Sequence, residues 1–353
     1  MTAMSASQST MQAYQLTRFQ QLGWAAGSMA TAIMLGALTS YALFYMTNYL
    51  GISVIVAGQL IGLSKFYDLI TDPVVGQFSD RTQTRWGRRR PYLALGAVLC
   101  PIALACLFAV PDFASQSATI IWLGCILLVY ATGFTFFNVP YLAMAAEMTT
   151  SPNERTLIMA QRIFFSTLGI LLISSLGPTL IEYFGGGEVG YFRMSWVMAS
   201  AVFLAMTLAF VATHNAPTVP PSPRGSYGIR KQWQLISANR PFRFYMFAKI
   251  FMFLSQSSVQ GSLLFFAFYV LGNDEMILAA FGIGYTIGSV TTLPIWNWLI
   301  SHRIGKRNAF MISAVGLGFI FLTWMLAAPG EPIEMLYTRF LLLGVFSAGS
   351  QVS

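Results

Sequence analysis

Long apolar segments follow one another through almost the whole chain and constrain its fold more than any other feature. Each is about as long as the roughly 20 residues that a helix needs to cross a bilayer. Because the hydrocarbon core offers the backbone no water, windows of this length favour spanning helices. With 56% apolar and 9% charged residues, the chain is predicted to be an all-α polytopic membrane protein. Ten windows are expected, at residues 23–48, 54–78, 92–110, 118–143, 157–181, 192–213, 242–271, 276–300, 309–328 and 335–353.

The loops between these windows alternate in charge. Lys and Arg in short loops remain on the cytoplasmic side, so the alternation predicts a cytoplasmic N-terminus and a multi-pass protein of the plasma (inner) membrane. Residues 1–21 lack the basic start and apolar stretch of a cleaved signal peptide. The net charge of +8 is explained by orientation in the membrane, and no nucleic-acid partner is expected. The basic loops carry Arg81 to Arg90, Arg155, Arg224, Arg230, Lys231, Arg240, Arg243, Arg303, Lys306 and Arg307, and the acidic loops carry Asp112, Glu182, Glu188, Asp274, Glu275, Glu331 and Glu334.

A polar segment divides the windows into two groups. Residues 214–241 contain the run APTVPPSPRGS, which is typical of a flexible cytoplasmic linker. A basic motif recurs at matching loops, as RWGRR at residues 85–89 and RIGKR at 303–307. Taken singly, each motif is explained by the positive-inside bias, but the matched pair indicates a transporter with two duplicated halves. We expect an N-terminal six-helix bundle at 1–213 and a C-terminal bundle at 242–353, truncated to about four of six helices because the last window stops at Ser353.

Three charged residues lie inside the second window. A carboxylate at the centre of a spanning helix costs roughly 2.5–3.5 kcal/mol on insertion scales, so Lys65, Asp68 and Asp72 are expected to face the bundle interior or a wet cavity. Asp68 and Asp72 are four residues apart on one helix face, where their repulsion favours binding of a proton or Na⁺ between them. Lys65 can neutralise the pair when the cation is absent. The alternative is an internal salt bridge that only holds helices together.

A second polar group lies in the fourth and fifth windows. Thr135 and Asn138 are three residues apart on one face, and a hydroxyl and a carboxamide are oxygen ligands for Na⁺ or a polar solute. Hydrogen bonds between helices explain them equally well. Arg162 lies a few residues inside the fifth window, where it points at an anionic or hydroxylated ligand or extends to the interface; the inward direction is favoured.

The loop after the second window is rich in arginine and has a single acid, Asp80, beside it. We expect Glu147, Glu154 and Arg155 to form salt bridges with this loop at the cytoplasmic end and so to make a gate. The predicted gate residues are Asp80, Arg81, Arg85, Arg88, Arg89, Arg90, Glu147, Glu154 and Arg155.

Two stretches carry a family resemblance, DLITDPVVGQFSDRTQTRWGRRRP and NVPYLAMAAEMTTSPNERTLIMAQR. They resemble the glycoside–pentoside–hexuronide:cation symporters, the melibiose-carrier-like branch of the major facilitator superfamily. The resemblance implies two pseudo-symmetric six-helix bundles, alternating access and sugar uptake driven by Na⁺, H⁺ or Li⁺. It also implies a cation site made of Asp68, Thr71, Asp72 and Thr135. Arg162 matches an arginine beside the sugar, and the basic motif matches the family's cytoplasmic gate.

The chain departs from melibiose carriers at two sugar-binding aspartates. Ala32, beside Thr31, and Asn138 stand at their positions, so no acidic group remains for galactoside hydroxyls. Once Asp68 and Asp72 hold a cation, Arg162 and Lys65 leave surplus positive charge, which favours an anionic solute or one bound by neutral hydrogen bonds. The substrate-binding residues expected on this basis are Thr31, Ala32, Asn138, Arg162 and Lys65.

Other functions remain alternatives. Sodium-dependent lysophospholipid carriers of the same branch share the cation motif, so a lipid-like solute stays open, as does a non-transporting receptor or scaffold. No grouping of nucleophile, base and orienter is evident, so an enzyme is not expected. We expect no cofactor, no metal beyond the transported cation, and a monomer whose partners are the solute, the cation and the bilayer.

Overall fold

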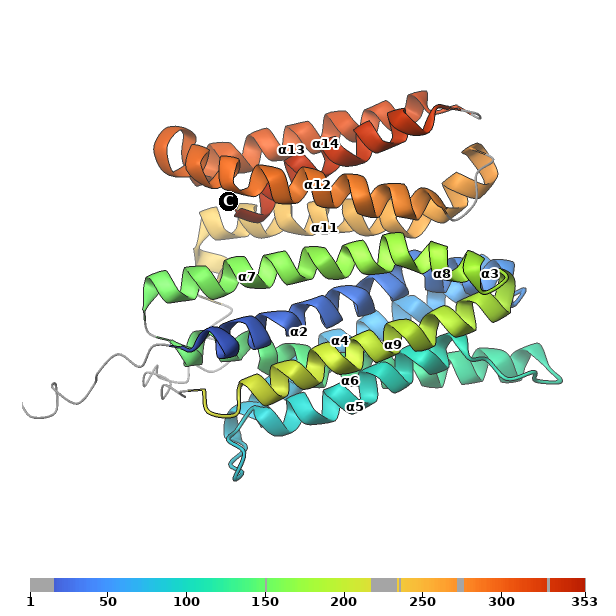
Figure 1. Ribbon diagram of the computed structural model, residues 1–353, viewed down its shortest axis with the longest axis horizontal. Helices are drawn as coiled ribbons and strands as arrows, with labels where there is room; N and C mark the ends of the chain where they lie inside the picture. The colour runs from blue at the N-terminus through green and yellow to red at the C-terminus, as the bar shows by residue number, and fades with distance from the viewer. Residues whose placement is uncertain are drawn as a thin grey trace, which may run out of the picture.

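The computed structural model of the protein describes residues 16–149, 151–216, 234, 236–271, 276–328 and 331–352, and the regular structure in this part of the chain is helical. The segments run side by side (Figure 1). They are α2 (Arg18–Gly36), η1 (Ala37–Ala42), α3 (Leu43–Asn48), α4 (Val54–Arg81), α5 (Arg90–Phe108), α6 (Gln116–Met148), α7 (Pro152–Leu171), η2 (Leu172–Leu176), α8 (Gly177–Tyr183), α9 (Gly187–Ala212), α11 (Arg240–Phe266), η3 (Ala267–Leu271), α12 (Met276–Leu299), η4 (Ile300–Ile304), α13 (Gly305–Thr323), η5 (Trp324–Leu326) and α14 (Ile333–Val352).

Eight stretches of the described residues are long and apolar enough to cross a membrane. The first seven coincide with the first seven predicted windows, and the eighth, Ala279–Leu326, runs through α12 and α13. The tenth window is helical as α14. The predicted fold class, an all-α polytopic membrane protein, is confirmed. The predicted linker 214–241 lies mostly outside the described residues, as do Arg224, Arg230, Lys231, Asp274 and Glu275 of the predicted loops.

Polar side chains define where several helices begin. A side-chain oxygen accepts a backbone N–H in the first turn, which satisfies a donor that has no partner within the helix. At α2 the arrangement is a full capping box between Thr17 and Gln20. The capping residues of α4, α6, α7 and α11 are Ser53, Ser115, Ser151 and Asn239. The helices therefore begin at polar residues that precede the apolar windows, and they are longer than the windows alone predict.

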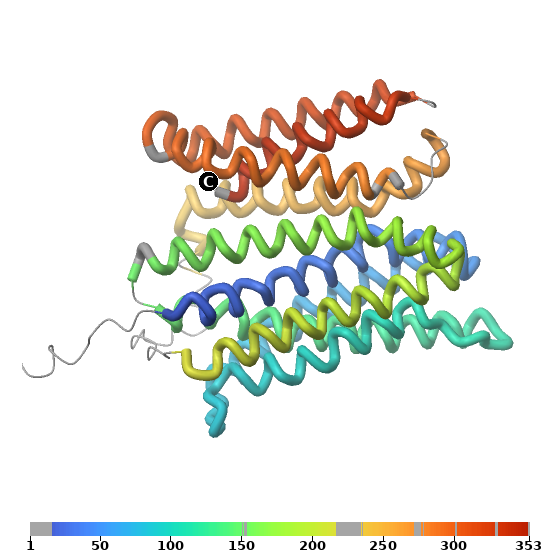
Figure 2. The backbone as a smooth tube through the Cα atoms, viewed as in Figure 1, coloured from blue at the N-terminus to red at the C-terminus, as the bar shows by residue number. Residues whose placement is uncertain are grey.

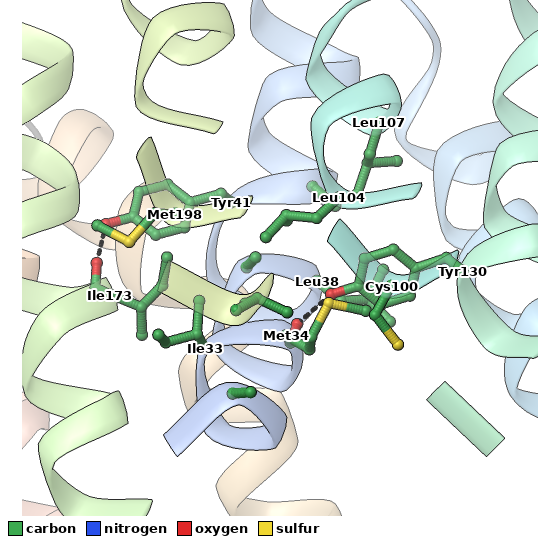
Figure 3. Packing of buried hydrophobic residues seen from close by; sticks show 14 of the residues in the cluster. Ile33, Met34, Leu38, Tyr41, Cys100, Leu104, Leu107, Tyr130, Ile173 and Met198 are labelled. Carbon is green, nitrogen blue, oxygen red and sulfur yellow. Dashed lines mark hydrogen bonds between the residues drawn. The ribbon is translucent and has the colours of Figure 1, made fainter. Parts of the chain in front are cut away.

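Helix α2 lies at the centre of the N-terminal half, packed against α7 and α9. Its apolar side chains fill a core in which two tyrosines reach across to backbone carbonyls (Figure 3). The Tyr41 hydroxyl donates to the Ile173 carbonyl at 2.8 Å, and the Tyr130 hydroxyl donates to the Met34 carbonyl. These carbonyls belong to π-helical or neighbouring turns whose bonding is irregular, so the tyrosines both pack and satisfy the backbone.

The C-terminal helices α11, α12, α13 and α14 form a second group beside α7 (Figure 2). One end of the molecule carries Arg81–Arg90, the α6–α7 turn and the end of α9; we call it the basic end, at the left of the view. The other end carries Asn48, Tyr183 and Leu271, and we call it the opposite end.

Between the described parts of the two groups of helices, hydrogen bonds from Thr39, Tyr269 and Ser175 cross, all in the part of the helices nearer the opposite end. Thr39 donates to Gln260 at 3.1 Å, Tyr269 donates to Asn48 at 2.9 Å, and Ser175 donates to the Ala279 carbonyl at 3.2 Å. Thr39, Ser175 and Tyr269 lie in the π-helical segments η1, η2 and η3. The two groups are therefore held together through segments with irregular helical bonding, which are frequent at functional sites.

Candidate functional site

The predicted carboxylate pair lies on α4 and connects to α6. Lys65 Nζ is 2.9 Å from Asp68 Oδ2, and the Asp68 side chain is 15% exposed. Thr135 Oγ1 on α6 donates to Asp72 Oδ1 at 2.7 Å. Thr135 is buried and Asp72 is exposed. The structure thus brings together Asp68, Asp72 and Thr135 as expected, with Lys65 paired to Asp68 in the way that neutralises one carboxylate.

Other oxygens surround this pair. Thr71 donates its hydroxyl to the Tyr67 carbonyl at 3.0 Å, which leaves the Thr71 oxygen able to accept or to ligate. The Tyr67 hydroxyl lies 3.0 Å from Thr132 Oγ1. Sequence reasoning missed Tyr67 and Thr132, although Thr132 is three residues before Thr135 and so shares its helix face.

One carboxylate oxygen in this group has no hydrogen bond. Asp68 Oδ1 is buried and lacks a partner, while its other oxygen binds Lys65. A buried acceptor without a partner is costly unless a ligand satisfies it. Carboxylate and hydroxyl oxygens on two adjacent helices are the ligands that a hard cation prefers, and carboxylates also take up protons. Within the described residues, Asp68 thus has one oxygen paired to Lys65 and one oxygen left without a partner.

Arg162 lies in a different group, between α7, α6 and α2. Its carbonyl accepts the Ser28 hydroxyl at 2.7 Å, and its Nε is buried without a partner. The fully buried Tyr141 places its hydroxyl near Ser28 and Arg162, and Trp24 stacks on the Tyr141 ring at 4.8 Å. The Gln161 Oε1 is also buried without a partner. Sequence reasoning favoured an inward Arg162 but missed Trp24 and Tyr141, whose only signal was their place in an apolar run.

The other predicted substrate-binding residues lie in different surroundings. Thr31 is buried and donates to the Ser28 carbonyl of its own helix at 3.0 Å. Ala32 is 7% exposed, and a Cβ at Gly169 would lie 2.9 Å from the Ala32 Cβ, so Ala32 lies in the contact between α2 and α7. Asn138 is half-buried on α6, between Thr135 and Tyr141. Asn138 thus lies between Thr135 and Tyr141 in the sequence of α6, whereas Ala32 packs helices together.

The basic end holds a compact cluster of ion pairs. The Arg89 guanidinium, 9% exposed, is 2.6 Å from both Asp80 Oδ1 and Glu147 Oε1, and it also donates to Ser79 at 3.2 Å. Arg88 shares the same Glu147 oxygen at 2.9 Å. Charge-assisted bonds of this length are strong, so the loop after α4 is fixed to α6. The predicted pairing of Glu147 with the arginine loop is confirmed.

Other predicted gate pairings are wrong in the structure. Glu154 accepts the Leu16 N–H at 2.7 Å and the Thr149 hydroxyl, because it lies in the first turn of α7 beside the start of α2. Arg155 donates to the carbonyls of Ala146 and Thr149, which have no helical partner at the end of α6.

Three more arginines of the predicted gate lie in the same loop region. Arg90 donates to the Phe210 carbonyl at 3.0 Å and lies 4.4 Å from the centre of the Phe210 ring. Arg85 lies over the Trp86 ring at 5.6 Å, and Arg81 is exposed in the last turn of α4. Among the described residues, these three arginines form no ion pair.

No group of three or more metal-ligating side chains occurs within the described ranges. A bundle of membrane-length helices that carries ionisable side chains inside its spans is typical of polytopic membrane transport proteins. Residues 23–353 match the MFS/sugar transport protein family, and the chain belongs to it. The predicted resemblance to glycoside–pentoside–hexuronide:cation symporters is thereby confirmed.

Named relatives agree with this assignment. YagG of Escherichia coli K12, provisionally named a glycoside/cation symporter, is 30% identical over 94% of this chain and 72% of its own length. The isoprimeverose transporter of Lactiplantibacillus pentosus is 25% identical over 83% of this chain and 61% of its own length. A glucuronide carrier protein homolog of E. coli is 25% identical, covering 86% and 66%. The chain thus spans between 61% and 72% of the length of these relatives.

Solved structures show the same fold. A D-xylose-proton symporter superposes with a TM-score of 0.62 at 17% identity, covering 95% of this chain and 79% of its own. The nucleoside transporter NupG gives 0.63 at 12% identity, covering 94% and 81%. The major facilitator fold is therefore confirmed.

Proposed function

We propose that this protein is a cation-coupled secondary symporter that moves Na⁺ or H⁺ together with a sugar, glycoside or related organic solute by alternating access. The observation that carries the proposal is the pair of carboxylates Asp68 and Asp72 inside one span, with Lys65 paired to Asp68 and Thr135 of α6 bonded to Asp72. Intramembrane carboxylates are expensive to retain and typically mark ion or proton pathways. The names of YagG, the isoprimeverose transporter and the glucuronide carrier homolog support this class of solute.

In this proposal the cation replaces Lys65 at Asp68. The ligands are oxygens of Asp68, Asp72, Thr71 and Thr135, and Asp68 Oδ1 is the acceptor that gains a partner. Binding neutralises the repulsion between the two carboxylates, so occupied and empty sites favour different arrangements of α4. That difference is what couples the cation to the conformational change.

The solute binds beside Arg162 and Asn138, which lies between Thr135 and Tyr141 on α6. Arg162 Nε and Gln161 Oε1 are buried without partners and supply a donor and an acceptor. With a cation on Asp68 and Asp72, Arg162 and Lys65 leave the region positive, so an anionic glycoside is preferred. Thr31 and Ala32 act by packing α2 against its neighbours.

The basic end is cytoplasmic in this proposal, with the protein in the inner membrane as a monomer, because arginine-rich loops remain on that side. Arg88 and Arg89 with Glu147 fix the loop after α4 there. The contacts of Thr39, Ser175 and Tyr269 close the outer side, and transport requires that they open.

Uptake by the protein in vesicles, driven by an imposed Na⁺ or pH gradient, tests this function with sugars, glucuronides and lysolipids as solutes. Asp72→Asn is expected to abolish gradient-driven accumulation, because a neutral carboxamide has no negative charge to attract Na⁺ and cannot take up a proton. The matched control is Glu182→Gln, an exposed carboxylate at the opposite end, which is expected to accumulate solute normally. Concentrative uptake by Asp72→Asn at the control level would refute the cation site.

A further inference from the structure

A cavity of about 240 Å³ lies at the basic end, beside the ion pairs of Arg88 and Arg89 with Glu147 and away from the groups around Asp68 and Arg162. The six consecutive residues Arg85–Arg90 line one wall, and the ends of α6 and α9 line the other. Four arginines face this cavity and only one carboxylate, Glu147, does so. Asp80 pairs with Arg89 but is not among the lining residues, so positive charge exceeds negative even when both acids are counted.

The arginines differ in how much of their bonding capacity is used. Arg89 binds two carboxylates and Ser79, so it has little left for a ligand. Arg88 shares a single oxygen of Glu147 with Arg89, and Arg85 lies over the Trp86 ring and forms no ion pair with a described residue. Arg90 is 7% exposed, and its Nε has no hydrogen-bond partner. A buried guanidinium N–H without a partner is unfavourable, and an acceptor bound in the cavity would satisfy it.

The surroundings place this cavity at the level of the lipid headgroups. Trp86 is 44% exposed and contacts the Phe210 ring at 5.9 Å, and tryptophan at the end of a membrane helix marks the interface. Leu208 and Val211 lie on either side of Phe210 in α9 and expose their apolar side chains. A ligand with an anionic head and apolar tails has the chemistry to match both the arginines of the cavity and the exposed apolar side chains of α9.

We propose that this cavity binds the phosphate group of an anionic phospholipid, with Arg85, Arg88 and Arg90 as the donors and the acyl chains along Leu208 and Val211. Basic pockets between membrane helices are suited to anionic headgroups, and guanidinium groups bind phosphate through paired hydrogen bonds. The lipid bridges α9 and the loop that follows α4, so it stabilises the basic end. The proposal does not depend on which solute or cation is transported.

Thermal unfolding of the detergent-purified protein with added phosphatidylglycerol, phosphatidylcholine or inorganic phosphate tests this site. Phosphatidylglycerol is expected to raise the Tm, and phosphatidylcholine is not. Arg85→Gln and Arg90→Gln are each expected to lose more than half of that rise. The matched control is Arg307→Gln, an exposed arginine of the second basic motif outside the cavity, which should keep the full rise.

Each other result overturns the proposal. An equal rise with phosphatidylcholine would mean that the headgroup charge is irrelevant. A rise with inorganic phosphate but not with phosphatidylglycerol would identify a free anion as the ligand. A full phosphatidylglycerol rise in Arg85→Gln, whose exposed side chain is the least expected to disturb folding, would show that the lipid binds elsewhere. Native mass spectrometry, which counts bound phosphatidylglycerol on wild type and Arg85→Gln, provides the second readout if Arg90→Gln fails to fold.

Discussion

The two basic motifs are alike in sequence and differ in what their arginines contact. In the motif at residues 85–89, Arg89 is almost buried between Asp80 and Glu147. In the motif at 303–307, Arg303, Lys306 and Arg307 are exposed, and no ion pair to them exists in the part of the chain that the structure describes. The residue five positions before the motif is Asp80 in the first case and Trp298 in the second. A repeated basic motif therefore becomes a structural cluster only where neighbouring helices supply acids.

The largest expected difference between the two motifs comes from removing their last arginine. Arg89→Gln is expected to lower the free energy of unfolding by about 3 kcal/mol, because it leaves Glu147 as a nearly buried charge without its main partner. Arg307→Gln is expected to change it by less than about 0.5 kcal/mol, since that side chain is exposed. Unfolding in mixed detergent micelles, followed by circular dichroism, measures both. Equal changes would show that the ion pairs do not distinguish the motifs.

Removing the acid that pairs with the arginines of the first motif is a second test of the same difference between the motifs. Glu147→Gln is expected to cost about 2 kcal/mol, because Arg88 and Arg89 lose the negative charge that they share and keep at most a neutral amide acceptor. The double variant Arg89→Gln with Glu147→Gln should cost less than the two single changes together, since both remove one interaction. Strict additivity in this double-mutant cycle would argue against a direct pair.

Replacing the glycine is expected to destabilise both motifs equally, in contrast to replacing their last arginine. Gly87 has φ of 92° and Gly305 has φ of 69°, and a Cβ at either position meets open space. Gly87→Ala and Gly305→Ala should therefore each cost about 1 kcal/mol through backbone strain alone. Gly58→Ala in α4, also in open space but helical, is the control and should not destabilise. A lower free energy of unfolding in only one of the two glycine variants would mean that the two turns are not equivalent.

The smallest effect is expected at Asp80, whose side chain is 57% exposed. Its pair with Arg89 is screened by water, so Asp80→Asn is expected to cost less than about 1 kcal/mol. The same unfolding experiment, repeated at high salt, should reduce this cost further. If Asp80→Asn cost as much as Glu147→Gln, the exposed Asp80 would stabilise the cluster as much as Glu147 does, which would contradict this prediction.

The grouping of Thr135 with Asp72 was implied by the family resemblance, whereas the residues alone grouped Thr135 with Asn138 on one helix face. The Lys65–Asp68 pair followed from their spacing of three residues on one helix. The partners of Glu154 and Arg155 could not be anticipated. Glu154 meets the N–H of Leu16, which is 138 residues away in the chain, and spacing says nothing about such a contact.

Membrane-length helices, the two polar groups and the recurrence of the basic motif were determined by the sequence alone. Hydrophobic length, charge and local spacing belong to the chain itself and do not depend on how its helices meet. Only the tertiary structure decided that Arg90 binds the Phe210 carbonyl, that Tyr141 lies against Arg162, and that Ala32 packs on Gly169. Those contacts depend on the rotation of each helix about its axis and on which helix stands beside it, because side chains from distant segments meet only after packing is complete.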